Sequence, residues 1–199
     1  MIFYSDKIIE DIIDSNELDE IIDRVDHFKK DIEMIFVYFA YPKISLGYIE
    51  NLLISDSNKV AFYCMDDTFD IRNCPSCMIY SKQHNKNNNK NNNKNNKNNN
   101  KNNNKNSDEI IYYIMMICTQ RRFKNMGYAT MLLNGFVERV KTESSSKTKI
   151  VLSSVDEVVS YYQKYGFEAV DYTLENYPYL MRFEKYDENK MYTIMELYI

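Results

Sequence analysis

The stretch RRFKNMGYAT, residues 121–130, has the residue types of an anion-binding turn. It follows an apolar run typical of a strand and precedes a run typical of a helix, and it contains Gly127 although the chain has only 4 glycines in 199 residues. Glycine at a strand–helix turn lets the backbone approach a ligand and point successive N–H groups at it. The helix N-terminus, Lys124 and two preceding arginines add positive charge. We expect either a phosphate site or a basic connector. The stretch lacks the GxxxxGK[ST] and GxGxxG patterns of P-loop and Rossmann nucleotide sites.

The cysteines are the other residues whose spacing suggests chemistry. There are four of them: Cys64, Cys74, Cys77 and Cys118. This usage fits a reduced compartment better than a disulfide framework. Cys74-Pro-Ser-Cys77 has the CxxC spacing of zinc ligands, but a closed zinc site needs about four ligands and the sequence has no second CxxC or HxxxH. We therefore expect ordinary thiols and no metal.

The elements that must position these residues follow from the hydrophobic pattern. Helices are predicted at 8–28, 31–43, 46–55, 130–142 and 156–165. Strands are predicted at 58–67, 74–82, 108–119, 147–155, 175–186 and 191–199. In the helix at 130–142, we expect Met131, Leu132, Phe136 and Val137 on one side. Helices come first, and then strands and helices alternate, which predicts an α/β fold with a mixed sheet.

Composition supports one soluble domain with an insertion. Hydrophobic residues make up 44% of the chain, enough for a core. Residues 85–106 consist of Asn and 6 Lys with no acid, so we expect a disordered insertion at about 85–107, inside a strand hairpin. Setting those six lysines aside changes the formal charge from −4 to −10. The acidic remainder suits a cationic acceptor, or only keeps the protein soluble.

No feature of the sequence predicts a membrane or nucleic-acid partner. The Asn/Lys tract has diluted charge and no interleaved aromatic residue for base stacking. The N-terminus lacks the basic start and cleavage site of a signal peptide, its acids argue against a transit peptide, and no run approaches a membrane span. We expect a cytoplasmic protein, with the nucleus as the alternative.

Two motifs resemble those of a known family. Lys124-Asn-Met-Gly127-Tyr-Ala129 resembles the (Arg/Gln)-x-x-Gly-x-(Gly/Ala) loop of the Gcn5-related N-acetyltransferases, the GNAT superfamily. Further along, Tyr162-Gln-Lys-Tyr-Gly166-Phe resembles its second signature, Tyr-x-x-x-Gly-Phe. The resemblance covers residues 110–199. It implies one GNAT domain over residues 1–199, an α/β fold with a mixed, mostly antiparallel central sheet flanked by helices, and acetyl-CoA as cosubstrate.

Within the superfamily, the sequence is most similar to NatE-type catalytic subunits of N-terminal protein acetyltransferases. The run beginning Tyr113-Ile-Met resembles a strand of that enzyme, and Tyr41-Pro42-Lys43 with the helix after it resembles the turn that binds the first substrate residue. The segment GFEAVDYTLENY resembles the part that closes over the peptide. This chain departs from the pattern at five positions: Lys124 for Arg or Gln, Ala129 for the second Gly, Val155 for a frequent Asn, Pro178 for a Tyr, and Ile150 for a histidine implicated in deprotonating the substrate.

The resemblance implies roles for individual residues. Tyr162 would be the general acid that protonates the departing thiolate, because a phenol pKa near 10 keeps it protonated at neutral pH; the alternative is a buried aromatic. Tyr113 would be the base, acting through water; the alternative is packing. Acetyl-CoA would be held by main-chain groups of Ile117, Cys118, Thr119, Lys124, Asn125, Met126, Gly127, Tyr128, Ala129 and Thr130. The peptide N-terminus would be held by Tyr41, Pro42, Tyr177 and Tyr179.

The function implied is acetyl-CoA-dependent acetylation of protein N-termini by direct transfer in a ternary complex, with an auxiliary subunit as a further partner. Transfer through Cys118 as an acetyl-carrying nucleophile is disfavoured because no histidine partner is evident. The alternatives are a GNAT enzyme acting on a small amine such as glucosamine 6-phosphate or on a lysine side chain, and a catalytically silent acetyl-CoA-binding subunit. The histone-acetylating branch uses a glutamate base on its central strand, and IIYYIMMIC contains no acid.

Overall fold

A computed structural model describes residues 1–40, 46–85, 109–144, 147–170, 173–183 and 192–199, except for the side chains of residues 18, 19 and 40. The described part contains one seven-stranded sheet in the order β1-β2-β3-β4-β5-β7-β6. Its strands are β1 Ile2–Tyr4, β2 Asn58–Tyr63, β3 Ser76–Asn85, β4 Glu109–Thr119, β5 Thr148–Val155, β6 Glu168–Ala169 and β7 Tyr192–Tyr198. The pair β4–β5 is parallel and the other pairs are antiparallel, as the sequence predicted for a mixed, mostly antiparallel sheet.

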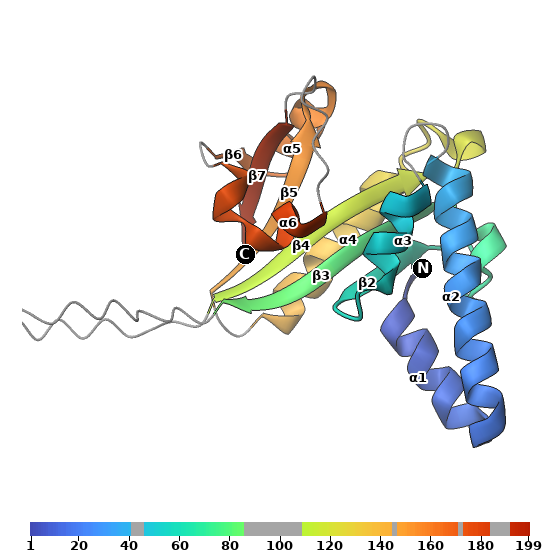
Figure 1. Ribbon diagram of the computed structural model, residues 1–199. Coiled ribbons are helices and arrows are strands. Elements are labelled where there is room, and N and C mark those ends of the chain that lie inside the picture. Colours follow the sequence, from blue (N-terminus) through green and yellow to red (C-terminus); the bar gives the residue numbers. More distant parts are fainter. Residues whose placement is uncertain (41–45, 86–108, 145–146, 171–172, 184–191) are drawn as a thin grey trace, which may run out of the picture.

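Helices cover both faces of this sheet (Figure 1). They are α1 Ser5–Ser15, α2 Leu18–Ala40, α3 Leu46–Ile54, α4 Tyr128–Glu143, α5 Val159–Gln163 and α6 Pro178–Phe183. Side chains of α2, α3 and α6 share one buried cluster with residues such as Tyr113 and Val151. Side chains of α4 and α5 share the other with residues such as Tyr112 and Ile150. We call these the α3/α6 face and the α4/α5 face of the sheet.

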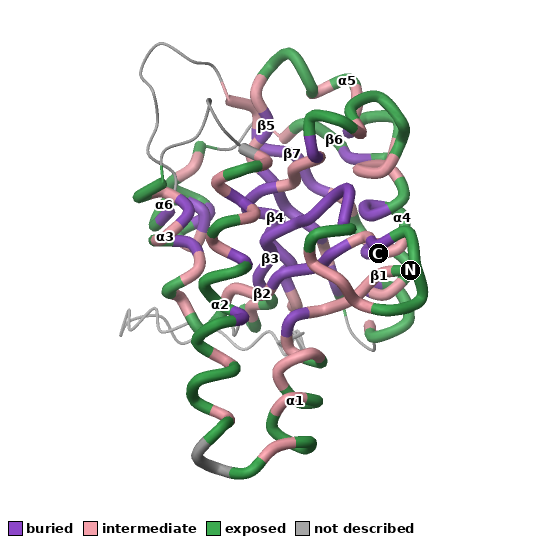
Figure 2. Tube along the Cα trace, turned by 90° about the vertical axis from the view of Figure 1, so that its right-hand side faces the viewer, coloured by how far each residue is buried: buried purple, intermediate pink, exposed green. Residues whose placement is uncertain are grey.

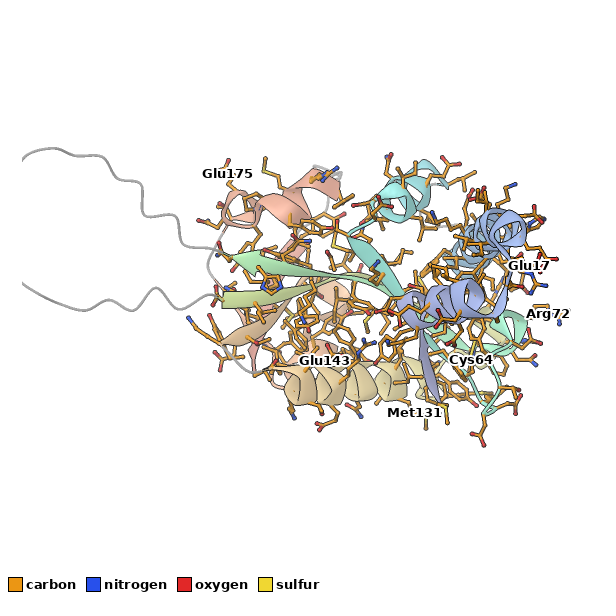
Figure 3. All side chains as sticks on the ribbon, turned by 90° about the horizontal axis from the view of Figure 1, so that it is seen from below. Glu17, Cys64, Arg72, Met131, Glu143 and Glu175 are labelled. Atoms are coloured by element: carbon orange, nitrogen blue, oxygen red, sulfur yellow. A yellow bond between two sulfur atoms is a disulfide. The ribbon has the colours of Figure 1, made fainter. Side chains whose placement is uncertain are left out.

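Residue spacing explains how α4 covers its face. Leu132, Leu133, Phe136 and Val140 are fully buried and recur with the helical period. Met131, expected on the same side, is 47% exposed, because one residue's step along a helix turns a side chain by about 100°. Figure 3 shows Met131 on the outer side of α4, away from the strands.

The N-terminal hairpin extends beyond the sheet. Figures 1 and 2 both show α1 and the first half of α2 projecting from the strands, with mostly exposed residues. The sequence predicted helices at 8–28 and 31–43, but α1 ends at Ser15 and α2 runs unbroken from Leu18 to Ala40, so the boundary between the two predicted helices was wrong. The Asn16 side chain bonds Ile12 O at 2.6 Å at the end of α1. Strand β1, which pairs with β2, was not predicted. No helix in the described ranges is both long enough and apolar enough to cross a bilayer.

Segment 175–186 was predicted to be a strand, but its described part is not one. Its described part forms a 3-10 turn, η4 Leu174–Asn176, and then helix α6. Pro178 occupies the first helical position, where its fixed φ and missing N–H cost nothing. Leu180 and Phe183, three residues apart, bury one side of this helix. The aromatic residues of this segment led to the prediction of a strand. Pro178 and the three-residue spacing of Leu180 and Phe183 are the features that favour the helix.

The prediction of four free thiols is also wrong. Cys64, at the end of β2, and Cys74 form a disulfide, with Cα atoms 4.2 Å apart. Cys77 and Cys118 are free. The chain between the paired cysteines includes the 3-10 turn η1 Ile71–Asn73 and returns to the sheet beside β2, so their proximity depends on tertiary structure. Cys74 is therefore not available as a CxxC metal ligand beside Cys77.

The Asn/Lys tract lies almost wholly outside the described residues. Strands β3 and β4 pair as far as Asn85↔Glu109, which flank it directly. The position predicted for the insertion, within a strand hairpin, is therefore confirmed, whereas its disorder stays a prediction.

Candidate functional site

Strands β4 and β5 organise the site because they pair over only part of their length. The parallel ladder runs from Ile110↔Thr148 to Ile114↔Leu152, and both strands continue beyond it. Just past the last pair, Met115 is an extra residue of β4, since Ile114 and Met116 pair with adjacent residues of β3. A bulge bends its strand, and Figure 1 shows β4 and β5 running apart. We call the place where pairing ends the β4–β5 divergence.

Beyond the divergence, β4 has main-chain groups that pair with none of the described strands. The Gln120 N–H donates to Pro75 O at 2.9 Å, and the Cys118 carbonyl accepts from Ser76 Oγ at 2.7 Å, so both residues point their main chain toward β3. Main-chain groups alternate direction along a strand. The N–H and C=O groups of Ile117 and Thr119 therefore point toward the β5 side, where the ladder has ended. They can bond the pantetheine arm of acetyl-CoA, whereas those of Cys118 are directed away.

The predicted anion loop has the backbone geometry that its glycine suggested. Gly127 has φ +83° and Asn125 φ +66°, both left-handed, and Gly127 is the N-cap of α4. No atom lies within 4 Å of the position a Gly127 Cβ would occupy, so the glycine is required by its dihedral and leaves an open approach. Lys124 is exposed beside it. The N–H groups of Lys124 and Met126 already donate to Arg121 O and Phe123 O at 3.3 Å each. Within this loop, the N–H groups of Asn125 and Gly127 are therefore the donors left for a pyrophosphate among the residues described.

The first turn of α4 supplies further donors. The N–H groups of Tyr128, Ala129 and Thr130 donate to no acceptor among the residues described, and the first intrahelical bond runs from Met131 N–H to Gly127 O. Unpaired amides at a helix N-terminus favour an anion. The residues present therefore fit the phosphate groups of acetyl-CoA.

Tyr162 lies on the same face as this loop. It is 8% exposed in α5, and burial first, then Tyr161 and Cys118, raise its pKa above the ordinary value. Its phenol is therefore protonated at neutral pH and presents an O–H donor. The neighbouring Tyr161 hydroxyl lies 3.3 Å from Thr130 Oγ1, which ties α5 to the first turn of α4. The two sequence motifs thus meet on the α4/α5 face.

Tyr113 lies on the opposite face. Its ring stacks on that of Tyr179 with centroids 5.2 Å apart, and the Tyr179 hydroxyl bonds Asn58 Oδ1 at 2.8 Å and Ser57 Oγ at 2.7 Å. Burial first, then the nearby carboxylates Glu109 and Glu196, raise the pKa of Tyr113 to about 12. At pH 7 only about one molecule in 10⁵ would carry the phenolate. Tyr113 can position a water molecule or the acceptor, but it is a poor proton acceptor.

A buried carboxylate beside Tyr177 was missed by sequence reasoning. Glu196 is 2% exposed, and its Oε1 accepts from Lys149 Nζ at 2.6 Å and from the Tyr177 hydroxyl at 2.7 Å. Its Oε2 accepts from the Tyr198 hydroxyl at 2.6 Å. Burial alone would raise the pKa of Glu196, but these hydrogen bonds outweigh it and hold the pKa below its usual range. The period-two alternation of β5 and β7 was the available signal, because it places both charges on one face.

The remaining predicted residues have different environments. Ile150 is fully buried on the α4/α5 face, so β5 presents Lys149 and Val151, not Ile150, on the face of Tyr113. Burial raises the pKa of the Cys118 thiol to about 12, which keeps it from acting as a nucleophile. Tyr41 and Pro42 lie outside the described residues.

Comparison with known proteins agrees with this geometry. A family model for the acetyltransferase (GNAT) domain matches residues 99–177. No curated protein matches the sequence significantly. The fold is similar to that of GCN5 from Tetrahymena, with a TM-score of 0.54 and 16% identity over 88% of this chain and 89% of that one.

Two further solved structures share the fold. One is NAA60 from Arabidopsis thaliana in complex with a bisubstrate analogue, with a TM-score of 0.53 and 10% identity over 86% of this chain and 93% of that one. The other is the ribosomal-protein-S18-alanine N-acetyltransferase from Escherichia coli, with a TM-score of 0.50 and 10% identity over 100% and 94% of the two chains. Such low identities establish the fold alone. The family match identifies an acetyltransferase (GNAT) domain at residues 99–177, and on that match the protein is an N-acetyltransferase whose cosubstrate is acetyl-CoA.

Proposed function

We propose that the acceptor is the α-amino group of a protein N-terminus. The observation that carries this proposal is the lack of a proton acceptor with a pKa near neutrality beside Tyr113 in the described residues. Tyr113 itself is held protonated by burial. The two carboxylates that act on it are each paired with a lysine, Glu109 with Lys147 at 3.3 Å and Glu196 with Lys149 at 2.6 Å.

Such a site favours an amine that is already partly neutral. With a pKa near 8, about a tenth of an α-amine is neutral at pH 7, whereas about 0.04% of a lysine side chain is. The enzyme then needs to orient the neutral amine and does not need to deprotonate the ammonium form. The fold is shared by acetyltransferases with different acceptors, so it does not separate these classes, and the proposal rests on the site chemistry.

Each part of the site then has one task. Acetyl-CoA supplies the acetyl thioester, and the loop at Gly127, the first turn of α4 and the free edge of β4 hold its phosphates and pantetheine arm. In the transfer, the acceptor nitrogen bonds to the acetyl carbon, the bond from that carbon to sulfur breaks, and the nitrogen releases one proton to water. Tyr162 donates its hydroxyl proton to the departing sulfur and regains a proton from water, so the proton lost by the nitrogen balances the one taken up by the thiol. Tyr113, Tyr177 and Tyr179 form the aromatic surface on the acceptor side.

A panel of acceptors tests the proposal. We expect turnover of a Met-started peptide, at least tenfold less of the same peptide with a blocked N-terminus and an internal Lys, and little of glucosamine 6-phosphate. The kcat/KM for the free peptide should rise with pH up to the amine pKa near 8 and then level off, because only the neutral amine attacks. Tyr113→Phe should keep this pH dependence. Preferred turnover of the blocked peptide or the amino sugar would refute the proposal.

A further inference from the structure

One hydroxyl at the β4–β5 divergence is unexplained by the fold. Ser153 is the first residue of β5 beyond its last pair with β4, Ile114↔Leu152. Side chains alternate along a strand, so Ser153 shares a face with Val151, the partner of Tyr113. Continuing the ladder would set Ser153 opposite Met115, the bulged residue. It therefore lies where the strands part, on the acceptor side.

The oxygen of this side chain is buried and unpaired. Ser153 Oγ is shielded from solvent and has no hydrogen-bond partner among the residues described. Other serines of the sheet and its edge are paired: Ser5 Oγ accepts from Val60 N–H at 2.9 Å, Ser76 Oγ donates to Cys118 O at 2.7 Å, and Ser81 Oγ donates to Ser57 O at 2.9 Å. Leaving a buried hydroxyl unpaired is unfavourable, so each instance calls for a reason.

The arrangement of the two faces suggests which group could be the hydrogen-bond partner of the Ser153 hydroxyl. The phosphate loop and Tyr162 lie on the α4/α5 face, and Tyr113 and Tyr179 lie on the other. An acetyl group that enters the divergence from the α4/α5 face would lie next to an amine bound on the α3/α6 face. The amine nitrogen must come within about 3.5 Å of the acetyl carbon with its lone pair aligned. A hydroxyl at this point can fix that alignment by accepting an N–H hydrogen bond.

We propose that Ser153 Oγ accepts a hydrogen bond from the acceptor amine and orients its lone pair toward the acetyl carbon, on the evidence of its unpaired, buried oxygen at the β4–β5 divergence. This role deepens the proposed function, because it concerns the acceptor side of the same site. In this shielded position the bond is stronger than it would be in water. Ser153 transfers no proton and forms no covalent bond.

The test compares Ser153→Ala with Ser154→Ala in the full chain. Ser154 is the matched control, because it is the next hydroxyl along, is buried on the α4/α5 face and already bonds Val155 O at 3.0 Å. We expect Ser153→Ala to lower kcat/KM for the preferred acceptor about tenfold, with acetyl-CoA affinity and the free energy of unfolding unchanged or improved. Ser153→Thr, which keeps the hydroxyl, should retain most of the activity, and Ser154→Ala all of it.

The outcomes separate the two proposals. Full activity of Ser153→Ala on a free N-terminal peptide would overturn the role of Ser153 and leave the acceptor assignment intact. If only glucosamine 6-phosphate or a lysine peptide is turned over, and Ser153→Ala impairs that reaction, the acceptor assignment fails and the role of Ser153 stands. Absence of turnover with every acceptor would refute both. Equal losses in Ser153→Ala and Ser154→Ala would also refute the orienting role.

Discussion

The buried pair of Glu196 and Lys149 offers a quantitative test of how the acceptor side is held. Its N–O distance is 2.6 Å, and the side chains are 1% and 13% exposed. Removing one charge of a buried pair costs about 3–5 kcal/mol, because the other charge stays desolvated. Lys149 retains some contact with water, so we expect Glu196→Gln to lower the free energy of unfolding by about 3 kcal/mol. For a chain of this size that corresponds to a fall in Tm of roughly 6–12 °C.

Urea denaturation at pH 7 measures this loss, with Lys149→Met/Glu196→Gln as the matched control. The double variant removes both charges, so it should regain most of the lost stability. A pH series adds an independent check. The folded pKa of Glu196 is depressed, so its contribution is complete above its unfolded pKa, about 4.3, and is lost as the pH falls through the folded pKa. Wild type and Glu196→Gln should therefore begin to converge in stability as the pH falls below about 4.3, and should meet only once the pH is below the folded pKa.

Two results would refute this reasoning. A Glu196→Gln variant within about 0.5 kcal/mol of wild type would mean that the pair is solvated in solution. A double variant no more stable than the single one would mean that the loss came from the hydroxyl bonds of Tyr177 and Tyr198 and not from the charge on Lys149.

Three further predictions concern the loop, the acid and the disulfide. Gly127→Ala and Gly166→Ala both place Ala at a left-handed φ, +83° and +87°, so each should lower the free energy of unfolding by about 1–2 kcal/mol. Only Gly127→Ala should also weaken acetyl-CoA binding, tenfold or more, as measured by calorimetry. Equal acetyl-CoA affinities of the two variants would disprove the loop assignment. Tyr162→Phe should lower kcat about 100-fold without changing acetyl-CoA affinity, and undiminished turnover would remove Tyr162 as the acid. Reduction of Cys64–Cys74, which are 10 residues apart, should lower the free energy of unfolding by about 3 kcal/mol, and an unchanged urea midpoint in the reductant would contradict the bond.

The sequence alone predicted the elements and the loop geometry of the cofactor half of the site. A glycine at a strand–helix turn, followed by an apolar helix, depends on local dihedrals and spacing, and Gly127 has the left-handed φ that this reading required. The strand at 108–119 has hardly a polar gap, which is typical of a central strand, and the strand at 147–155 centres on the apolar residues Ile150, Val151 and Leu152; they form β4 and β5. Properties that depend on neighbours along the chain were therefore predictable.

The acceptor half depended on tertiary structure. Which side of β5 faces Tyr113 is a matter of register, and a shift of one residue exchanges the faces, so only the ladder shows that Lys149 and Val151 lie there and Ile150 does not. The unpaired oxygen of Ser153 follows from where that ladder ends. The Glu196 network and the disulfide join residues whose proximity the local sequence does not encode. Local chemistry thus predicted an anion-binding loop, the resemblance to the GNAT superfamily implied acetyl-CoA, and strand pairing determined which side chains share the face of Tyr113.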